Sequence, residues 1–185
     1  IGLNAPIAGH VFIGGDDIVT ASDEQLERIQ RRFGVMYQSG ALFGSMTLLE
    51  NVRLPLEVYT DLPDDAIDLV ARMKLELVGL EGFTGHMPAE RSGGMQKRAG
   101  IARALMLDPA LLFFDEPSAG LDPITAVELD QLIITLSRDL GITIVIVTHE
   151  LPSIFLVANR CIVLDKAAKG IVARGDPRTL RDESD

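Results

Sequence analysis

Two acidic side chains, Asp115 and Glu116, stand directly after the apolar run Leu111–Phe114. Such a run predicts a buried strand, and ligands bind at the carboxyl ends of strands in open α/β sheets. An Asp there can hold Mg²⁺, directly or through water. The following Glu can orient or deprotonate an attacking water. The pattern alone is only moderately specific, because a strand that ends in a polar turn has the same sequence.

A second group with potential chemistry is Ser92-Gly93-Gly94, at the start of a helix predicted to run to about Leu107. Two glycines let the backbone approach an anion closely, and the first N–H groups and the dipole of a helix favour negative charge. The Ser92 hydroxyl adds a donor. The competing interpretation is a Ser N-cap followed by a flexible turn.

Further polar residues follow predicted strands. Gln38 comes after the apolar run 33–37 and can reach a metal or an attacking water. His149 comes after Ile142–Val147 and can donate a hydrogen bond to a transferred phosphoryl group. Asp122 is the last residue of the segment Ser118–Asp122, which follows the carboxylate pair in the sequence. Each is weak alone, but their order along the chain, with Ser-Gly-Gly and Asp-Glu between Gln38 and His149, is very specific.

The elements that position these residues follow from periodicity and turn signals. Helical patterns dominate residues 38–106, with one helix starting at Thr47 and limited by Pro55, and two more over about 63–78 and 93–107. Before them we expect a short strand at 9–14, a helix from Ser22 with a Ser22–Gln25 capping box, and a strand at 33–37.

After Pro109 the pattern alternates between strand and helix. Strands are predicted at 111–114, 142–147, 161–164 and 170–174, and helices at 124–140 and 151–158. Fully apolar strands separated by helices imply a parallel sheet covered on both faces.

With these residues in place, the chain resembles the nucleotide-binding subunit of an ABC transporter along essentially its whole length. The resemblance makes Gln38 the Q-loop glutamine, Asp122 the D-loop aspartate and His149 the switch histidine. It also makes Ser92, Gly93 and Gly94 the core of the signature motif, and Asp115 and Glu116 the Walker B pair.

One branch of the family is more similar still. Gln38–Phe43, Gly93–Met95 and Asp122–Thr125 resemble the ATPases of the Mla and MCE-linked importers, which move phospholipids or other lipids. Arg91 stands where Leu is usual, which affects the expected packing of the helix rather than a phosphate contact.

The resemblance implies an α/β fold of the P-loop NTPase type, with a parallel sheet core and an inserted helical subdomain, incomplete at the N-terminus. Residues 1–38 would be part of the nucleotide-binding core, 39–107 the helical subdomain with the signature motif, and 108–185 the RecA-like core. ATP and Mg²⁺ are the implied substrate and cofactor.

The implied site divides into three roles. Glu116 would be the general base, with Gln38 and His149 sensing the γ-phosphate and Asp115 and Gln38 holding Mg²⁺. Ser92, Gly93 and Gly94 would act on the nucleotide of a partner subunit, and Asp122 would couple the two sites of a homodimer.

The resemblance also implies partners and a location. An integral-membrane permease would contact the face near Ser39–Pro55, and an MCE-type lipid-binding subunit is a further expected partner. The subunit would lie in the cytoplasm, peripheral on the inner face of the cell membrane, and power transport across it.

One required part is not in the sequence. A phosphate-binding loop needs Gly-x-x-x-x-Gly-Lys-Ser/Thr, and none of the four lysines follows a glycine. We expect the chain to begin after that loop and its helix, and to bind negligible ATP alone. The alternative is a non-catalytic interaction module derived from such an ATPase. An in-frame loop encoded before Ile1 would favour truncation.

Composition argues against other classes. The formal net charge is −10 and the basic residues are scattered, whereas nucleic-acid binders need basic stripes. An ABC-type ATPase acting on DNA or ribosomes would carry long coiled coils or a second cassette, and neither pattern is present. The longest strongly apolar run, Ile142–Val147, is far shorter than the roughly 20 residues of a membrane helix.

Overall fold

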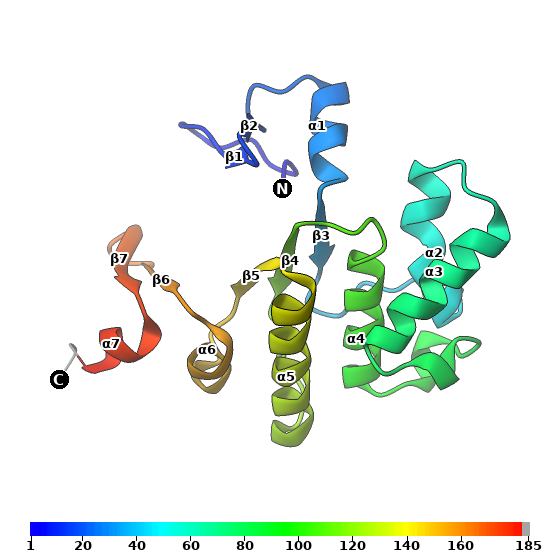
Figure 1. Ribbon diagram of the computed structural model, residues 1–185. Helices are drawn as coiled ribbons and strands as arrows, with labels where there is room; N and C mark the ends of the chain where they lie inside the picture. Colours follow the sequence, from blue (N-terminus) through cyan, green and yellow to red (C-terminus); the bar gives the residue numbers. More distant parts are fainter. Residues whose placement is uncertain (183–185) are drawn as a thin grey trace.

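The computed structural model describes residues 1–182, so the last three residues of the predicted 108–185 segment lie outside it (Figure 1). Its helices and strands follow one another in an order close to the predicted one. They are β1 Phe12–Ile13, β2 Asp16–Asp17, α1 Asp23–Gln30, β3 Phe33–Met36, α2 Leu48–Tyr59, α3 Asp64–Leu77, the 3₁₀ turns Glu81–Phe83 and Pro88–Glu90, α4 Gly93–Ala104, β4 Leu111–Asp115, α5 Pro123–Leu140, β5 Thr143–Val147, α6 Leu151–Val157, β6 Cys161–Asp165, β7 Gly170–Gly175 and α7 Pro177–Asp182.

The centre of the molecule is a parallel three-stranded sheet in the order β3-β4-β5. Phe114 of β4 lies opposite Met36 of β3 and Ile146 of β5. Met36, Leu112 and Phe114 are almost fully buried, as expected of apolar strands in a parallel sheet. The prediction of an α/β fold with a parallel sheet is therefore confirmed.

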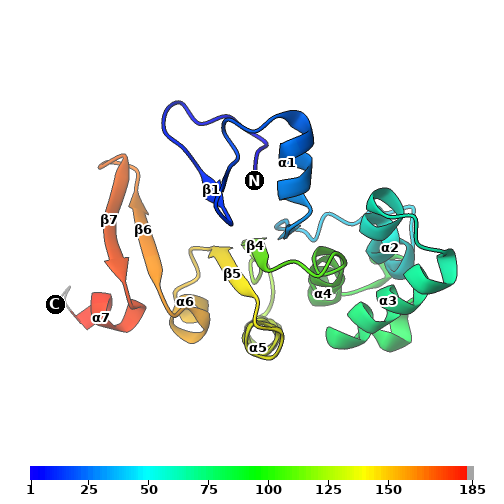
Figure 2. The ribbon, with the colours of Figure 1, turned by 45° about the horizontal axis from the view of Figure 1, so that its top comes forward.

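Two details of the predicted sheet are wrong. Strand β6 does not join the parallel sheet but pairs antiparallel with β7, and Figure 2 shows this hairpin standing beside the sheet. Alternate residues of β5 are exposed, with Val147 at 61%. Within residues 1–182 helices cover β5 on one face only, so burial on both faces does not hold there.

Helices α2, α3 and α4 pack against one another (Figure 1). Helix α2 continues past Pro55 to Tyr59, so the prediction that Pro55 limits it is wrong. A proline removes one helical N–H donor and strains the turn before it. Val52 and Leu56 on either side are buried in the core, and this packing outweighs the local cost.

One continuous hydrophobic core joins the helices to the sheet, with buried side chains from α2, α3, α4, β4 and α5. Helix α4 approaches β3 so closely that a Cβ atom on Gly34 would overlap the carbonyl oxygen of Ala104. Glycine at position 34 is therefore required for α4 to lie on the sheet. The division into segments 1–38, 39–107 and 108–185 stays a prediction.

The predicted capping box at the start of α1 is confirmed. The Ser22 hydroxyl accepts from the Gln25 N–H, and the Gln25 side chain accepts from the Ser22 N–H. These two bonds satisfy donors that have no partner within the helix.

Candidate functional site

The carboxyl ends of the three parallel strands lie at one edge of the sheet. Gln38 follows β3, Asp115 ends β4 with Glu116 directly after it, and His149 follows β5. The prediction that each of these residues follows a strand is confirmed, and the structure adds that the three strands are neighbours. Their chemical roles remain predictions.

The Glu116 carboxylate makes two side-chain hydrogen bonds at this edge. Its Oε1 lies 2.7 Å from Nδ1 of His149, and its Oε2 accepts a 3.2 Å hydrogen bond from the Thr148 hydroxyl. The hydrogen bond to Glu116, followed by its charge and that of Glu150, raises the pKa of His149 above its ordinary value. Thr148 was absent from the predicted site, although it directly precedes His149.

The backbone of Glu116 has an unusual conformation, with φ at +48°. Left-handed backbone is disfavoured for residues with a side chain and costs of order 1–3 kcal/mol. Its N–H donates to the Val147 carbonyl at 2.8 Å, which extends the β4–β5 ladder by one bond. The surrounding structure therefore fixes the direction in which the Glu116 carboxylate points.

Ser92 caps helix α4, because its Oγ accepts from the Met95 N–H at 3.3 Å. Gly93 is exposed, and Gly94 is buried beneath Thr125 of α5. A Cβ on Gly94 would lie 2.5 Å from Cγ2 of Thr125. Packing against Thr125 is therefore one reason why position 94 needs a glycine. The predicted contact of Gly94 with a nucleotide would be a second.

Gln38 is exposed and makes no side-chain hydrogen bond within residues 1–182. The loop after it is held by α4, since Arg103 donates to the carbonyls of Gly40 at 2.8 Å and Ala41 at 2.9 Å. Sequence reasoning missed Arg103. Its signal would have been a basic residue in the last turn of a helix with a buried face.

Asp122 is the N-cap of α5, and its carboxylate accepts from the N–H groups of Ile124 and Thr125 at 3.1 Å. The Thr125 hydroxyl and these backbone bonds lower the pKa of the Asp122 carboxyl. Asp122 therefore has a structural role in this chain as well as its predicted coupling role.

The predicted Mg²⁺ ligands were Asp115 and Gln38. No group of three His, Cys, Asp or Glu side chains within residues 1–182 is arranged to hold a metal. Asp115 is exposed at the end of β4. Mg²⁺ is commonly bound by one or two carboxylates together with waters and substrate phosphates. This donor set therefore fits Mg²⁺ only when phosphate and water supply the remaining ligands.

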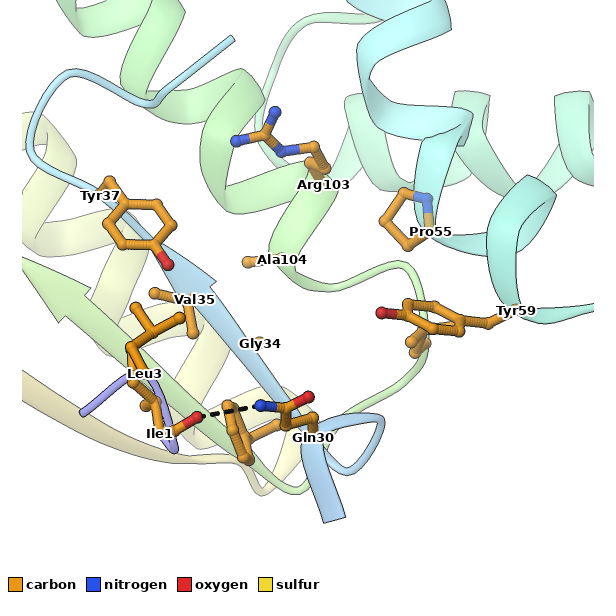
Figure 3. Close-up of a pocket in the computed structure, with 12 residues that line it drawn as sticks. Ile1, Leu3, Gln30, Gly34, Val35, Tyr37, Pro55, Tyr59, Arg103 and Ala104 are labelled. Atoms are coloured by element: carbon orange, nitrogen blue, oxygen red, sulfur yellow. Dashed lines mark hydrogen bonds between the residues drawn. The ribbon is translucent and has the colours of Figure 1, made fainter. Parts of the chain in front are cut away.

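A cavity of about 270 Å³ lies between β3, α2, α4 and the N-terminal residues (Figure 3). Tyr37, Tyr59 and Arg103 line it together with mostly apolar groups, and Gln30 bridges across its floor to the carbonyl of Ile1 at 3.2 Å. None of the predicted catalytic residues lines this cavity.

Comparison with known proteins decides the family. The family model described as ABC transporter matches residues 1–119. The chain is 41% identical to the intermembrane phospholipid transport system ATP-binding protein MlaF of Escherichia coli K12, over all of this chain and 68% of MlaF. The chain belongs to the ABC transporter ATP-binding family.

Other ABC proteins show the same likeness. The "Probable ribonucleotide transport ATP-binding protein mkl" of Mycobacterium leprae is 47% identical over 81% of this chain and 43% of its own length. The ABC transporter subunit CbiO1 of Clostridium perfringens superimposes with a TM-score of 0.87 at 26% identity, over 99% of this chain and 72% of CbiO1.

A further ABC cassette, MJ0796, was solved as a dimer in a post-hydrolysis state with ADP and Pi. It gives a TM-score of 0.83 at 31% identity, over 96% of this chain and 77% of MJ0796. Among residues 1–182 of this ABC chain, no helix is both long and apolar enough to cross a membrane.

Proposed function

We propose that Glu116 is the general base of an ABC-type ATP hydrolase that powers a membrane transporter. The observation that carries this proposal is the Glu116 carboxylate at a strand end, fixed between Thr148 and His149. A general base must be held within hydrogen-bond reach of the proton it removes. Glu116 takes the proton of the attacking water, and the exposed imidazole edge of His149 faces the transferred phosphoryl group.

Asp115 and Gln38 would hold Mg²⁺, which when bound would supply positive charge against the phosphates. Ser92, Gly93 and Gly94 act on the nucleotide of a second subunit, and Asp122 links the two sites. The dimeric state of MJ0796 supports this pairing. Because the 185 residues contain no phosphate-binding loop, they bind negligible ATP by themselves. Calorimetry with millimolar Mg-ATP tests this, and measurable turnover by the chain alone contradicts it.

The transported molecule is a lipid in our proposal, on the similarity to MlaF. The similar protein Mkl is named as a ribonucleotide transporter subunit, so a ribonucleotide is the alternative substrate. An MCE-type lipid-binding subunit would deliver or receive the lipid.

The permease contact is placed on the face near Ser39–Pro55, with the subunit peripheral on the cytoplasmic side of the membrane. Phe43 on this face is 55% exposed, and exposed aromatic anchors dominate many interfaces. Asn51, fully buried, fixes the loop that presents it. The Asn51 amide accepts from the Phe43 N–H at 2.7 Å and donates to the carbonyls of Phe43, Met46 and Thr47.

Replacing Phe43 by Ser should therefore abolish co-purification with the membrane subunit without loss of folding. Leu69→Ser is the matched control, because Leu69 of α3 is 62% exposed outside this face. Equal binding by the Phe43→Ser variant would place the permease elsewhere.

The decisive test of the function uses the complete gene product with its membrane subunit in phospholipid vesicles. We expect phospholipid to stimulate ATP hydrolysis, and Glu116→Gln to abolish it. Stimulation by ribonucleotides instead of phospholipid would support the Mkl-like substrate. Full hydrolysis by the Glu116→Gln variant would overturn the catalytic proposal, and absence of hydrolysis in the unaltered complex would favour the non-catalytic interaction module.

A further inference from the structure

Lys97 of helix α4 is a buried lysine that no part of the predicted site includes, with only 5% of its surface exposed. Lysines are almost never fully buried unless their charge is paired or hydrogen-bonded. Here the ammonium donates to two backbone carbonyls, that of Glu116 at 3.2 Å and that of Ala119 at 2.6 Å. Burial lowers the pKa of this lysine, and the nearby Glu116 charge partly offsets the effect.

The two carbonyls are the ends of one tight turn. The Ala119 N–H donates to the Glu116 carbonyl at 3.3 Å, which closes a turn over residues 116–119. Glu116, the first residue of this turn, has the left-handed backbone described above. Such a conformation persists only where surrounding contacts hold it. Lys97 supplies a charge-assisted contact at each end of the turn, and such bonds are roughly twice as strong as neutral ones.

The direction of the Glu116 side chain depends on this backbone. The Val147 carbonyl fixes the Glu116 N–H, and Lys97 fixes its carbonyl, so the carboxylate points toward His149 and Thr148. Without Lys97, relaxation of the left-handed φ would rotate the carboxylate away from these partners.

We propose that Lys97 is a positioning residue that holds the turn 116–119 and thereby aims the Glu116 carboxylate at the strand edge. It also joins the helix that begins at Ser92 to the backbone of Glu116, so a movement of α4 reaches the carboxylate through one side chain. The role in hydrolysis rests on the proposed function of Glu116, whereas the role in aiming its carboxylate does not.

The test compares Lys97→Met, Lys97→Arg and Arg98→Met in the complete gene product. Methionine keeps the apolar stem of lysine without the donor, and arginine restores donors. Arg98, on the same helix as Lys97, is the matched control. Its guanidinium donates to the Val78 carbonyl at 3.2 Å, and not to Glu116 or Ala119.

Two readouts separate positioning from stability. The pKa of His149, followed by NMR, reports its bond to Glu116, and the kcat and KM for ATP report catalysis. We expect Lys97→Met to lower the pKa of His149 toward 6.5 and kcat by about 10–100-fold at nearly constant KM, since small misplacements at a reacting centre cost up to about 100-fold. Lys97→Arg should recover much of both values, and Arg98→Met should change neither.

An unchanged His149 pKa in Lys97→Met, or an equal drop in Arg98→Met, overturns the proposal. If Lys97→Met does not fold, Lys97→Leu, which likewise carries no donor, takes its place with the same two expected changes. Failure of the general-base proposal is recognised separately, because Glu116→Gln would then retain turnover while the His149 pKa still reports on Lys97.

Discussion

The carboxylate of Glu116 and the imidazole of His149 are joined by a 2.7 Å hydrogen bond across the ends of two neighbouring strands. The Glu116 side chain is 19% exposed and that of His149 is 75% exposed. One partner is therefore sheltered and the other open to solvent and to any bound nucleotide. This asymmetry suits the roles proposed above, in which Glu116 is a base held in place and His149 contacts a ligand.

Replacing Glu116 by Gln should return the pKa of His149 toward its ordinary value of 6.5, because Glu116 provides the largest contributions that raise it. Two-dimensional NMR titration of the histidine ring measures the change. Glu150→Gln is the control, since Glu150 makes the smallest contribution and its carboxylate lies 3.7 Å from Nε2 of His149. A larger drop in the control than in Glu116→Gln would show that the 2.7 Å bond does not govern the titration.

Gly94 offers a way to separate packing from nucleotide binding. Gly94→Ala should destabilise the protein by about 1–3 kcal/mol through overpacking, because the new Cβ would lie 2.5 Å from Cγ2 of Thr125. Adding Thr125→Ser removes that methyl group and keeps the hydroxyl that donates to Asp122. We expect the double variant to regain stability in urea unfolding.

If Gly94 also contacts a partner's nucleotide, ATP hydrolysis by the complete gene product will stay low in the double variant despite its restored stability. Thr125→Ser alone is the control and should hydrolyse ATP normally. Recovery of both stability and turnover in the double variant would leave Gly94 with a packing role only.

Local signals in the sequence were sufficient for most elements. The Ser22 capping box predicts the start of α1, and the apolar period from Ile67 to Leu75 predicts α3. The predicted end of α2 at Pro55 was wrong because the free-energy cost of a proline inside the helix is smaller than the free energy gained by burying its neighbours. That burial becomes visible only in the tertiary structure. In the same way, the pairing of β6 depends on which strands are available beside it, and no property of Cys161–Asp165 alone decides this.

The candidate site likewise contains residues that could be predicted from the sequence and others that could not. The strand ends at Asp115, Glu116 and His149 can be predicted from the sequence because an apolar run precedes each of them. For Lys97, the sequence offers one signal: a charged residue on the same helical face of α4 as Gly94 and Ile101, which are buried. The left-handed φ of Glu116 leaves no mark in the sequence, because glutamate carries no preference for that conformation.

Gly34→Ala should destabilise the fold by about 3 kcal/mol, at the upper end of overpacking costs. The added methyl group would overlap the Ala104 carbonyl and lie 2.7 Å from Cδ2 of Leu112, and neither the helix backbone nor the central strand can move freely. Gly44→Ala is the control, since nothing lies within 4 Å of a Cβ there, and its effect should stay within about 0.5 kcal/mol. Equal midpoints in urea for the two variants would contradict the tight approach of α4 to β3.

Asp130 of α5 is a buried carboxyl whose Oδ2 accepts a 2.7 Å bond from the Ser153 hydroxyl, while its Oδ1 has no partner within the described residues. Burial raises the pKa of Asp130 above its ordinary value of 3.8, and the Ser153 bond opposes this only in part. The folded protein therefore holds the proton more tightly than the unfolded chain. Stability from this group is complete below pH 3.8 and is lost as pH rises through the higher folded pKa.

Asp130→Asn removes this titration and keeps an acceptor for Ser153. The free energy of unfolding of the variant should therefore rise relative to the unaltered protein as pH increases from about 4 to 7, measured by urea unfolding at each pH. Asp139→Asn on the same helix is the control, because the hydrogen bond to Arg138 lowers the pKa of Asp139 below 3.8, so this variant should show no rise between pH 4 and 7. A constant difference between Asp130→Asn and the unaltered protein over this range would mean that Asp130 stays charged in the core. The buried contact between α5 and α6 would then need a second donor for its free oxygen.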